Sequence, residues 1–329
     1  MLNHVDLDYF SSRRTLITGG AGFIGSWLCD TLILAGAEVH CADNLSTGIP
    51  ANIQHLFNVS KFVFRESDVT QPSLGDKEYD FIAHFASRAS PDDYQQHPIQ
   101  TLEANSQGTR NMLELCRKND AVLLYASTSE IYGDATVVPT PEEYWGNVNP
   151  IGLRSCYDEG KRFGEALCMA YHRAHGLDVR IVRIFNTYGP RLRPDGLYGR
   201  AVSKFIDSAL TNRQITIYGK GDHTRSFCYV TDTIAGIVRA AIQGRMKGEV
   251  VNIGGQREIT VLELAEKIKT LTSSKSKITF LPEQSDDPRR RCPDITKAKQ
   301  ILGWAPIVTL EDGLRETINW FNQRRPSPP

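Results

Sequence analysis

The sequence predicts an α/β fold, in which a doubly wound parallel sheet carries a smaller mixed α/β C-terminal lobe. Two observations support this prediction. In the first half of the chain, short runs with strand propensity alternate with stretches of helical periodicity, and this alternation is typical of a parallel sheet with helices on both faces. After Phe185 the pattern loosens into loops that contain Gly and Pro, with helical stretches between them.

The individual elements follow from these patterns. Short β-rich runs predict strands at Thr15–Thr18, Glu38–Ala42, Phe62–Glu66, Phe81–Phe85, Val122–Ala126 and Val179–Ile184. Amphipathic spacing predicts helices at Gly25–Ala35, Leu102–Lys118 and Cys156–His175, and later near 200–211, 232–243, 261–271 and 311–323. The strand Val250–Ile253 is expected to return to the main sheet. We therefore expect one domain over 1–186, rejoined by 226–254, and a second lobe over 187–225 and 255–329.

The composition excludes several classes of protein. The chain has 329 residues, of which 40% are hydrophobic and 23% charged, as in a soluble globular protein. Its 38 basic and 38 acidic side chains balance, so nothing predicts nucleic-acid binding. Seven cysteines form no CxxC pair, which suits a reducing compartment, and we expect them to be mostly buried. No apolar run is long enough to span a membrane, and no metal site is predicted; a cytoplasmic location is expected.

A glycine-rich turn follows the first predicted strand, where a helix begins. Gly19, Gly22 and Gly25 are three apart and enclose Phe23 and Ile24. This spacing lets the backbone approach a diphosphate at the positive end of the helix, and the last glycine allows close packing of helix on strand. A tight loop without a ligand is the alternative for such a turn taken alone. With the surrounding strands, the turn predicts a Rossmann-like dinucleotide site.

Carboxylates at the next strand ends extend this prediction. Asp43, followed by Asn44, ends the second strand 18 residues past Gly25. A carboxylate at this place accepts hydrogen bonds from both ribose hydroxyls and repels a 2′-phosphate, so NAD is expected rather than NADP. Asp68 and Val69, after the third strand, are expected to contact the adenine, although an aspartate there can also serve only as a cap.

One tyrosine has the surroundings of a catalytic base. Of the 12 tyrosines, Tyr157 alone has a lysine four residues later, Lys161. These two side chains share a helix face, and an ammonium beside a phenol lowers the phenol pKa from about 10. Thr128, Ser129 and Glu130 follow the fifth strand, and ligands of parallel sheets bind beyond strand ends. They are expected to converge on Tyr157, unless Thr128 and Ser129 merely cap a turn.

Together these motifs resemble the extended short-chain dehydrogenase/reductase family, which acts on nucleotide sugars and keeps NAD bound. The resemblance runs from residue 14 to about residue 324. Within the family, segments 127–134, 143–150, 156–162 and 288–295 are similar to the UDP-glucuronate decarboxylases. The resemblance implies oxidation of the sugar at C4, loss of CO₂ from the 4-keto acid and re-reduction to UDP-xylose. It also implies a homodimer built from the helices at 102–118 and 156–175.

The resemblance assigns roles to individual residues. Catalytic roles are implied for Thr128, Ser129, Glu130, Tyr157, Lys161 and Arg291. Arg291 would hold the C6 carboxylate in its fork, although without the resemblance the run 289–291 would be interpreted as a solvated basic surface. Binding of the UDP-sugar is implied for Tyr94, Asn186, Arg191, Tyr218, Arg225 and Arg291. Two departures from the decarboxylase pattern lie near the expected sugar site: Arg88 replaces the usual proline, and the segment 193–200 is about two residues longer.

Three alternatives stay open at this point. A nucleotide-sugar 4,6-dehydratase expels the C6 hydroxyl and carries an aspartic acid at the position of Ser129, where this chain offers only a weakly acidic hydroxyl. A C4 epimerase, such as one acting on UDP-glucuronate, would use Tyr157 but has no evident use for Glu130. A non-catalytic NAD-binding regulatory protein would be expected to lack Tyr157 or Lys161, and both are present.

Overall fold

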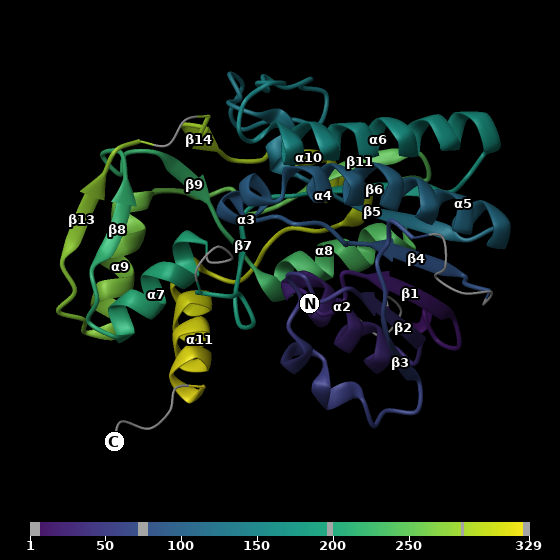
Figure 1. Ribbon diagram of the computed structural model, residues 1–329, viewed down its shortest axis with the longest axis horizontal. Helices are drawn as coiled ribbons and strands as arrows, with labels where there is room; N and C mark the ends of the chain where they lie inside the picture. The colour runs from purple at the N-terminus through teal and green to yellow at the C-terminus, as the bar shows by residue number, and fades with distance from the viewer. Residues whose placement is uncertain (1–6, 72–77, 196–199, 284–285, 325–329) are drawn as a thin grey trace.

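A seven-stranded, all-parallel sheet forms the centre of the protein (Figure 1). The computed structural model describes residues 7–71, 78–195, 200–283 and 286–324. The strand order is β11-β6-β5-β4-β1-β2-β3. The strands are β1 (Arg14–Thr18), β2 (Glu38–Asp43), β3 (Phe62–Glu66), β4 (Phe81–His84), β5 (Val122–Thr128), β6 (Val179–Ile184) and β11 (Glu249–Ile253).

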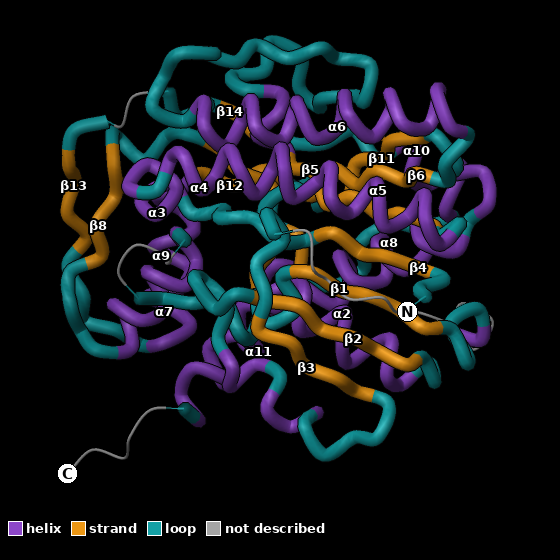
Figure 2. Tube along the Cα trace, turned by 45° about the vertical axis from the view of Figure 1, so that its right-hand side comes forward, coloured by secondary structure: helices purple, strands orange, loops and turns teal. Residues whose placement is uncertain are grey.

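Helices cover both faces of this sheet (Figure 2). One face is covered by α5 (Thr109–Asn119) and α6 (Ser155–His175), and the other by α2 (Phe23–Leu34) and α8 (Val230–Ile242). Successive side chains of a strand point to opposite faces, so Leu16 belongs to the core under α5 and α6. Its neighbour Ile17 belongs to the core under α2 and α8. Burial on both faces explains why the strands are continuous apolar runs.

A smaller mixed lobe lies beside the sheet, to the left in Figure 1. Its helices are α7 (Ala201–Leu210), α9 (Val261–Thr272) and α11 (Leu310–Gln323). Short strands complete it: β8 (Ile215–Tyr218) pairs with β13 (Ile278–Leu281), and β9 (Thr224–Ser226) lies between β12 (Glu258–Thr260) and β14 (Arg290–Arg291). A further pair, β7 (Thr187–Tyr188) and β10 (Cys228–Tyr229), connects the lobe to the sheet. The α/β fold with a parallel sheet and a mixed lobe is therefore confirmed.

The chain departs from the predicted elements at several places. The predicted helix Leu102–Lys118 is divided into α4 (Pro98–Glu103), a π-helical segment Ala104–Gly108, and α5. The buried Asn105 lies in the π segment and donates to the Ser87 hydroxyl and the Thr101 carbonyl. Neither α3 (Pro91–Gln96) nor α10 (Thr296–Leu302) was predicted.

Other expectations hold. The segment Val250–Ile253 does return to the sheet, because β11 pairs with β6. However, α10 packs on β11 and α8, so part of 255–329 also lies against the sheet; the domain boundaries stay a prediction. All seven cysteines are free and buried, as expected. Among the described residues, no helix combines the length and apolar character needed to cross a membrane.

Candidate functional site

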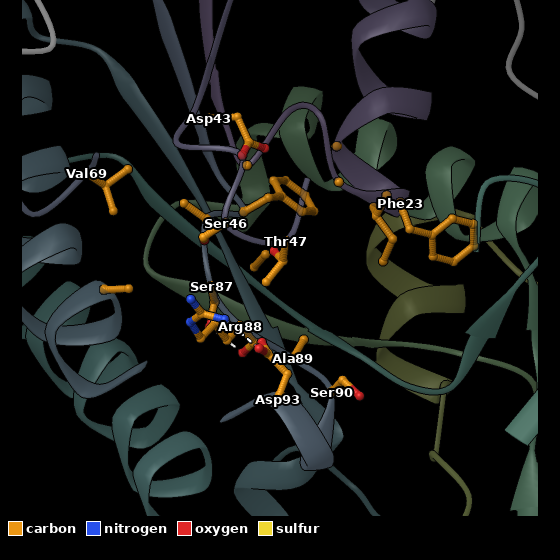
Figure 3. A pocket seen from close by; sticks show the side chains of 18 of the residues that line it. Phe23, Asp43, Ser46, Thr47, Val69, Ser87, Arg88, Ala89, Ser90 and Asp93 are labelled. Atoms are coloured by element: carbon orange, nitrogen blue, oxygen red, sulfur yellow. Dashed lines mark hydrogen bonds and ion pairs between the residues drawn. The ribbon is translucent and has the colours of Figure 1, made fainter. Parts of the chain in front are cut away.

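One cleft gathers most of the residues that the sequence singled out (Figure 3). It opens where the carboxyl ends of β1, β2, β4 and β5 meet, as expected for a parallel sheet. Its lining includes all predicted cofactor residues, together with Thr128 and Arg191: Gly19, Gly22, Phe23, Ile24, Gly25, Asp43, Asn44, Asp68, Val69, Tyr157 and Lys161. Residues from positions 19 to 191 thus reach one cavity.

The glycine turn is shaped so that only glycine fits. A Cβ on Gly25 would lie 2.2 Å from the Gly19 carbonyl oxygen, so α2 could not pack as closely on β1. Gly19 has a positive φ of 70°, and its Cβ would lie 2.7 Å from the Ala86 nitrogen. Helix α2 begins at Phe23 with no side-chain cap and no acid in its first turn. Its first N–H groups are therefore left for a ligand, and an anion is favoured there.

Asp43 and its neighbours form the adenosine end of the cleft. The Asp43 carboxylate accepts the backbone N–H of Ala21 at 3.0 Å and of Leu45 at 2.8 Å, and burial raises its pKa. Asn44 donates to Asp68 at 2.8 Å, which joins the tips of β2 and β3. These residues fit a dinucleotide: backbone donors for a diphosphate lie in the same cleft as a held carboxylate for a ribose.

Tyr157 lies at the other end of the same cleft. Its ring stacks on that of Tyr94, with 5.1 Å between the ring centres and 6° between the planes, and its phenol is hydrogen-bonded to the side chain of Thr128. Burial raises the pKa of Tyr157 to about 12; Glu130 adds to this, while Arg200 and Thr128 oppose it. The expected lowering by a neighbouring ammonium was therefore wrong for the protein alone.

The position of Lys161 explains why the pKa of Tyr157 is not lowered as expected. Its Nζ donates to the Ala126 carbonyl oxygen at 2.8 Å and lies 5.0 Å from the centre of the Tyr125 ring. Burial lowers the pKa of Lys161 to about 7. A lysine that is half neutral near pH 7 and directed at a backbone carbonyl stabilises a phenolate weakly. Lys161 nevertheless lines the cleft together with Tyr157.

Glu130 is held between two arginines, which we call the Glu130 clamp (Glu130, Arg154 and Arg291). Arg291 from β14 donates both Nη groups to the two carboxylate oxygens, at 2.7 and 2.8 Å. Arg154, which precedes α6, donates to the same carboxylate. All three side chains are buried. Although burial alone would raise it, the two arginines lower the pKa of Glu130 to about 2, so Glu130 is a carboxylate at neutral pH.

A second carboxyl lies beside the clamp. Asp158, the residue after Tyr157, has one carboxylate oxygen 3.8 Å from the Nε of Arg154, and its other oxygen has no hydrogen-bond partner within the described chain. Burial, and then the charge of Glu130, raise the pKa of Asp158 to about 8. Asp158 is therefore mostly protonated at pH 7. Consequently the positive charge of the clamp is not cancelled by Asp158.

The clamp retains unused hydrogen-bond donors. The Nε groups of Arg154 and Arg291 are buried and have no hydrogen-bond partner in the described part of the protein. The nearest further carboxylate is Asp287, 3.7 Å from Arg154, and it also pairs with Arg225 at 3.0 Å. Three guanidinium groups, those of Arg154, Arg225 and Arg291, thus lie around the carboxylates of Glu130 and Asp287.

The predicted substrate residues are spread more widely than the cofactor residues. Of the six, Arg191 lines the main cleft, where it pairs with Asp30 at 2.6 Å. Arg225 is buried on β9, whereas Tyr218 on β8 is about half exposed. Asn186 approaches the Ser226 carbonyl at 3.5 Å, and Tyr94 stacks on Tyr157 as described. In the predicted longer segment 193–200, residues 196–199 lie outside the described residues.

Thr128 and Ser129 also match the alternative of a turn cap. Thr128 ends β5, two residues later than predicted, and its hydroxyl accepts the backbone N–H of Glu130 at 3.3 Å. Ser129 is buried in the short 3₁₀ turn Ser129–Tyr132 that follows. Thr128 therefore both caps the turn and contacts Tyr157.

Sequence reasoning missed three residues at this site. Arg154 belongs to the clamp and Asp158 lies beside it. Arg200 lines the cleft and donates to the Ala89 carbonyl at 2.5 Å. Arg154 could have been found, because it stands three residues before Tyr157 and four before Asp158, on one helix face. Arg200 gave no such signal, since it is 43 residues from Tyr157.

Comparisons with known proteins agree with this geometry. Residues 15–254 match the NAD dependent epimerase/dehydratase family. The chain is 49% identical over 311 residues to UDP-glucuronic acid decarboxylase 1 of Danio rerio, covering 94% of this chain and 73% of that protein. It is 49% identical over 305 residues to UDP-glucuronic acid decarboxylase 5 of Arabidopsis thaliana, covering 92% and 88%. A crystal structure of UDP-glucuronic acid 4-epimerase from Bacillus cereus, with UDP-glucuronic acid and NAD, superposes with a TM-score of 0.85 at 29% identity, covering 94% and 99%.

Proposed function

The chain belongs to the NAD dependent epimerase/dehydratase family, and we propose that within it the protein is a UDP-glucuronate decarboxylase that forms UDP-xylose. The cofactor is NAD. The residues that would hold it are the glycine turn at the start of α2, Asp43 at the tip of β2, and Asp68 with Val69 beyond β3. When bound, NAD supplies a hydride acceptor for C4 and a positive charge in the cleft that contains Tyr157.

Tyr157 is the proposed base for the C4 hydroxyl. Its phenolate takes the O4 proton as the C4 hydrogen leaves as hydride, which forms a ketone at C4. Thr128 holds the phenol oxygen in place, and Arg200 favours the phenolate electrostatically. Because burial raises the pKa of Tyr157 to about 12, the base needs the further positive charge that accompanies the cofactor. The proton returns from Tyr157 to O4 when hydride is returned.

The Glu130 clamp is proposed to act on the acid end of the sugar. In a 4-keto acid the C5–C6 bond breaks, its electron pair flows into the C4 ketone as an enolate, and CO₂ leaves. A C6 carboxylate must be bound beforehand, and the positive charges of Arg154 and Arg291 suit it. A proton then adds at C5, and Ser129 and Glu130 are the residues proposed to position its donor.

The clamp is the observation that carries this choice of reaction. A dehydratase needs an acid next to the glutamate to protonate the departing hydroxyl, whereas the neighbour of Glu130 is Ser129, whose hydroxyl is only weakly acidic. The relatives at 49% identity are named as decarboxylases. A C4 epimerase is the second candidate, because the superposed UDP-glucuronic acid 4-epimerase shares the fold and binds the same acid sugar.

Product analysis tests the proposal. The purified protein is incubated with UDP-glucuronate, and released CO₂ and the nucleotide-sugar mass are followed together. We expect one CO₂ for each UDP-pentose formed. An isomer of unchanged mass without CO₂ would establish the epimerase instead, and loss of water would establish a dehydratase. A Tyr157→Phe protein serves as the matched control, because it keeps the ring stack with Tyr94 and loses only the hydroxyl.

We further propose a homodimer in the cytoplasm. Helix α4 packs beside α6, and Ile99, Leu102 and Phe163 expose 65%, 42% and 50% of their surface there, an area that a second copy of the chain would cover. Light scattering should give twice the chain mass, and Phe163→Glu should give a monomer; a wild-type monomer would contradict the proposal. The free cysteines support the cytoplasmic location, which cell fractionation tests.

A further inference from the structure

Arg88 is a charged residue in the main cleft that the reaction described above does not use. It follows β4, and the strand β4 pairs directly with β1. The backbone after β4 touches the glycine turn, because a Cβ on Gly19 would lie 2.7 Å from the nitrogen of Ala86. Ser87, Arg88 and the glycine turn line the same cavity. A cation at this position therefore lines the same cavity as the start of α2.

Asp93 holds Arg88 on the cleft wall (Figure 3). The Nη1 of Arg88 donates to an Asp93 oxygen at 2.5 Å, and 14% of the Arg88 side chain is exposed, against none of Asp93. The other Asp93 oxygen is buried and has no hydrogen-bond partner within the described residues. Asp93 lies in α3 next to Tyr94, which stacks on Tyr157. The pair thus fixes one end of the guanidinium and leaves the rest of it at the cleft surface.

Other basic residues of this cleft are engaged elsewhere. Arg191 pairs with Asp30, and Arg193 donates to Asp195 and to the Thr47 carbonyl. Lys161 donates to the Ala126 carbonyl, and Arg200 donates to the Ala89 carbonyl. A dinucleotide brings two phosphate charges, and the N–H groups of α2 supply only partial positive charge. The protein as a whole has a net charge of zero, so the compensating charge must be local.

We propose that Arg88 binds the diphosphate of the dinucleotide cofactor, with Asp93 as the positioning residue that aims its guanidinium into the cleft. The planar guanidinium of an arginine matches the spacing of phosphate oxygens. A bound phosphate would accept hydrogen bonds from the N–H groups of Arg88 that the bond to Asp93 does not use. The inference rests on a dinucleotide in the cleft and not on decarboxylation.

Binding of nucleotide fragments to nucleotide-free protein tests the proposal. The probes are ADP-ribose, which carries the diphosphate, adenosine, which carries none, and UDP, whose diphosphate belongs to the sugar nucleotide. Arg88→Gln keeps a donor for Asp93 and removes the charge; Arg117→Gln, on the outer face of α5 where Arg117 pairs with Glu114, is the matched control. We expect Arg88→Gln to lower the affinity for ADP-ribose about tenfold to a hundredfold and to make that affinity less dependent on salt. The binding of adenosine and of UDP should be unchanged.

Asp93→Asn separates positioning from folding. Because Asp93 acts through Arg88, this variant should lower ADP-ribose affinity less than Arg88→Gln, and the double variant should be no worse than Arg88→Gln alone. Unchanged ADP-ribose affinity in Arg88→Gln would overturn the proposal, as would an equal loss for adenosine, or a loss confined to UDP. Failure of the wild-type protein to bind ADP-ribose would overturn the cofactor site itself. None of these outcomes depends on the reaction product.

Discussion

Replacing Glu130 by glutamine tests the charge balance of the clamp. The change keeps the shape of the side chain and removes the carboxylate that Arg154 and Arg291 share. Removing one partner of a buried ion pair typically costs about 3–5 kcal/mol. Asp158 should offset part of this, because the charge of Glu130 is one cause of its raised pKa. Without that charge Asp158 ionises more readily and can pair with Arg154, so we expect a loss near 3 kcal/mol.

A double-mutant cycle isolates this compensation. Asp158→Asn alone replaces a protonated acid by a neutral amide and should change stability by less than about 1 kcal/mol. In Glu130→Gln with Asp158→Asn no carboxylate can take over, so the combined loss should reach about 5 kcal/mol, with a coupling of about 2 kcal/mol. Unfolding entropy scales with length, so in a chain of 329 residues a loss of about 3 kcal/mol lowers the melting midpoint by about 4 °C.

Thermal and denaturant unfolding at pH 7 provide the assay. The three variants and the wild type are compared in the same buffer, and each is checked for retained ADP-ribose binding, which shows that the nucleotide cleft is intact. If the two single losses add within about 0.5 kcal/mol, Asp158 does not respond to Glu130. The reasoning about the shared charge would then be refuted.

Three further predictions follow from the site. The wild type should lose stability as pH rises from about 4 to 8, relative to Asp158→Asn, in pH-dependent melting curves: the folded pKa of about 8 exceeds the ordinary value of 3.8, so the folded state keeps a proton that the unfolded chain releases. Tyr157→Phe should reduce kcat about 10²- to 10⁴-fold while ADP-ribose titration stays unchanged; near-wild-type turnover would exclude Tyr157 as the base. Gly25→Ala should abolish ADP-ribose binding and lower the melting midpoint, because its Cβ would meet the Gly19 oxygen at 2.2 Å, whereas Gly244→Ala meets nothing within 4 Å and should match the wild type.

Much of the fold could be predicted because its signals are local. Strands buried on both faces appear as apolar runs, and β3 and β6 have the predicted bounds. The division of the helix at 102–118 could not be predicted, because the buried Asn105 finds partners in Ser87 and Thr101 only in the folded chain. The short strands β12 and β14 are defined by β9, which lies between them in space, and periodicity over two or three residues carries no signal.

The site divides in the same way. The residues expected to bind the cofactor lie in a turn and at strand ends, and both features are determined by residues close to them in the sequence. By contrast, the clamp joins residues 161 positions apart, Glu130 and Arg291, so its pairing is invisible before folding. The predicted direction of the Tyr157 pKa shift was wrong for a related reason. Burial beneath Tyr94, which comes from another helix, raises this pKa more than the lysine on the same helix face lowers it.

The span of the Glu130 clamp has a consequence for biosynthesis. Arg291 leaves the ribosome long after the sheet and the glycine turn have emerged, because β14 follows all of them in the sequence. Domains generally fold in the order in which they are synthesised. Until β14 is synthesised, Glu130 lacks the guanidinium fork of Arg291. The pairing of Glu130 is thereby delayed to the last stage of translation, together with the burial of the core residues that follow β14, among them Trp304 and Phe321.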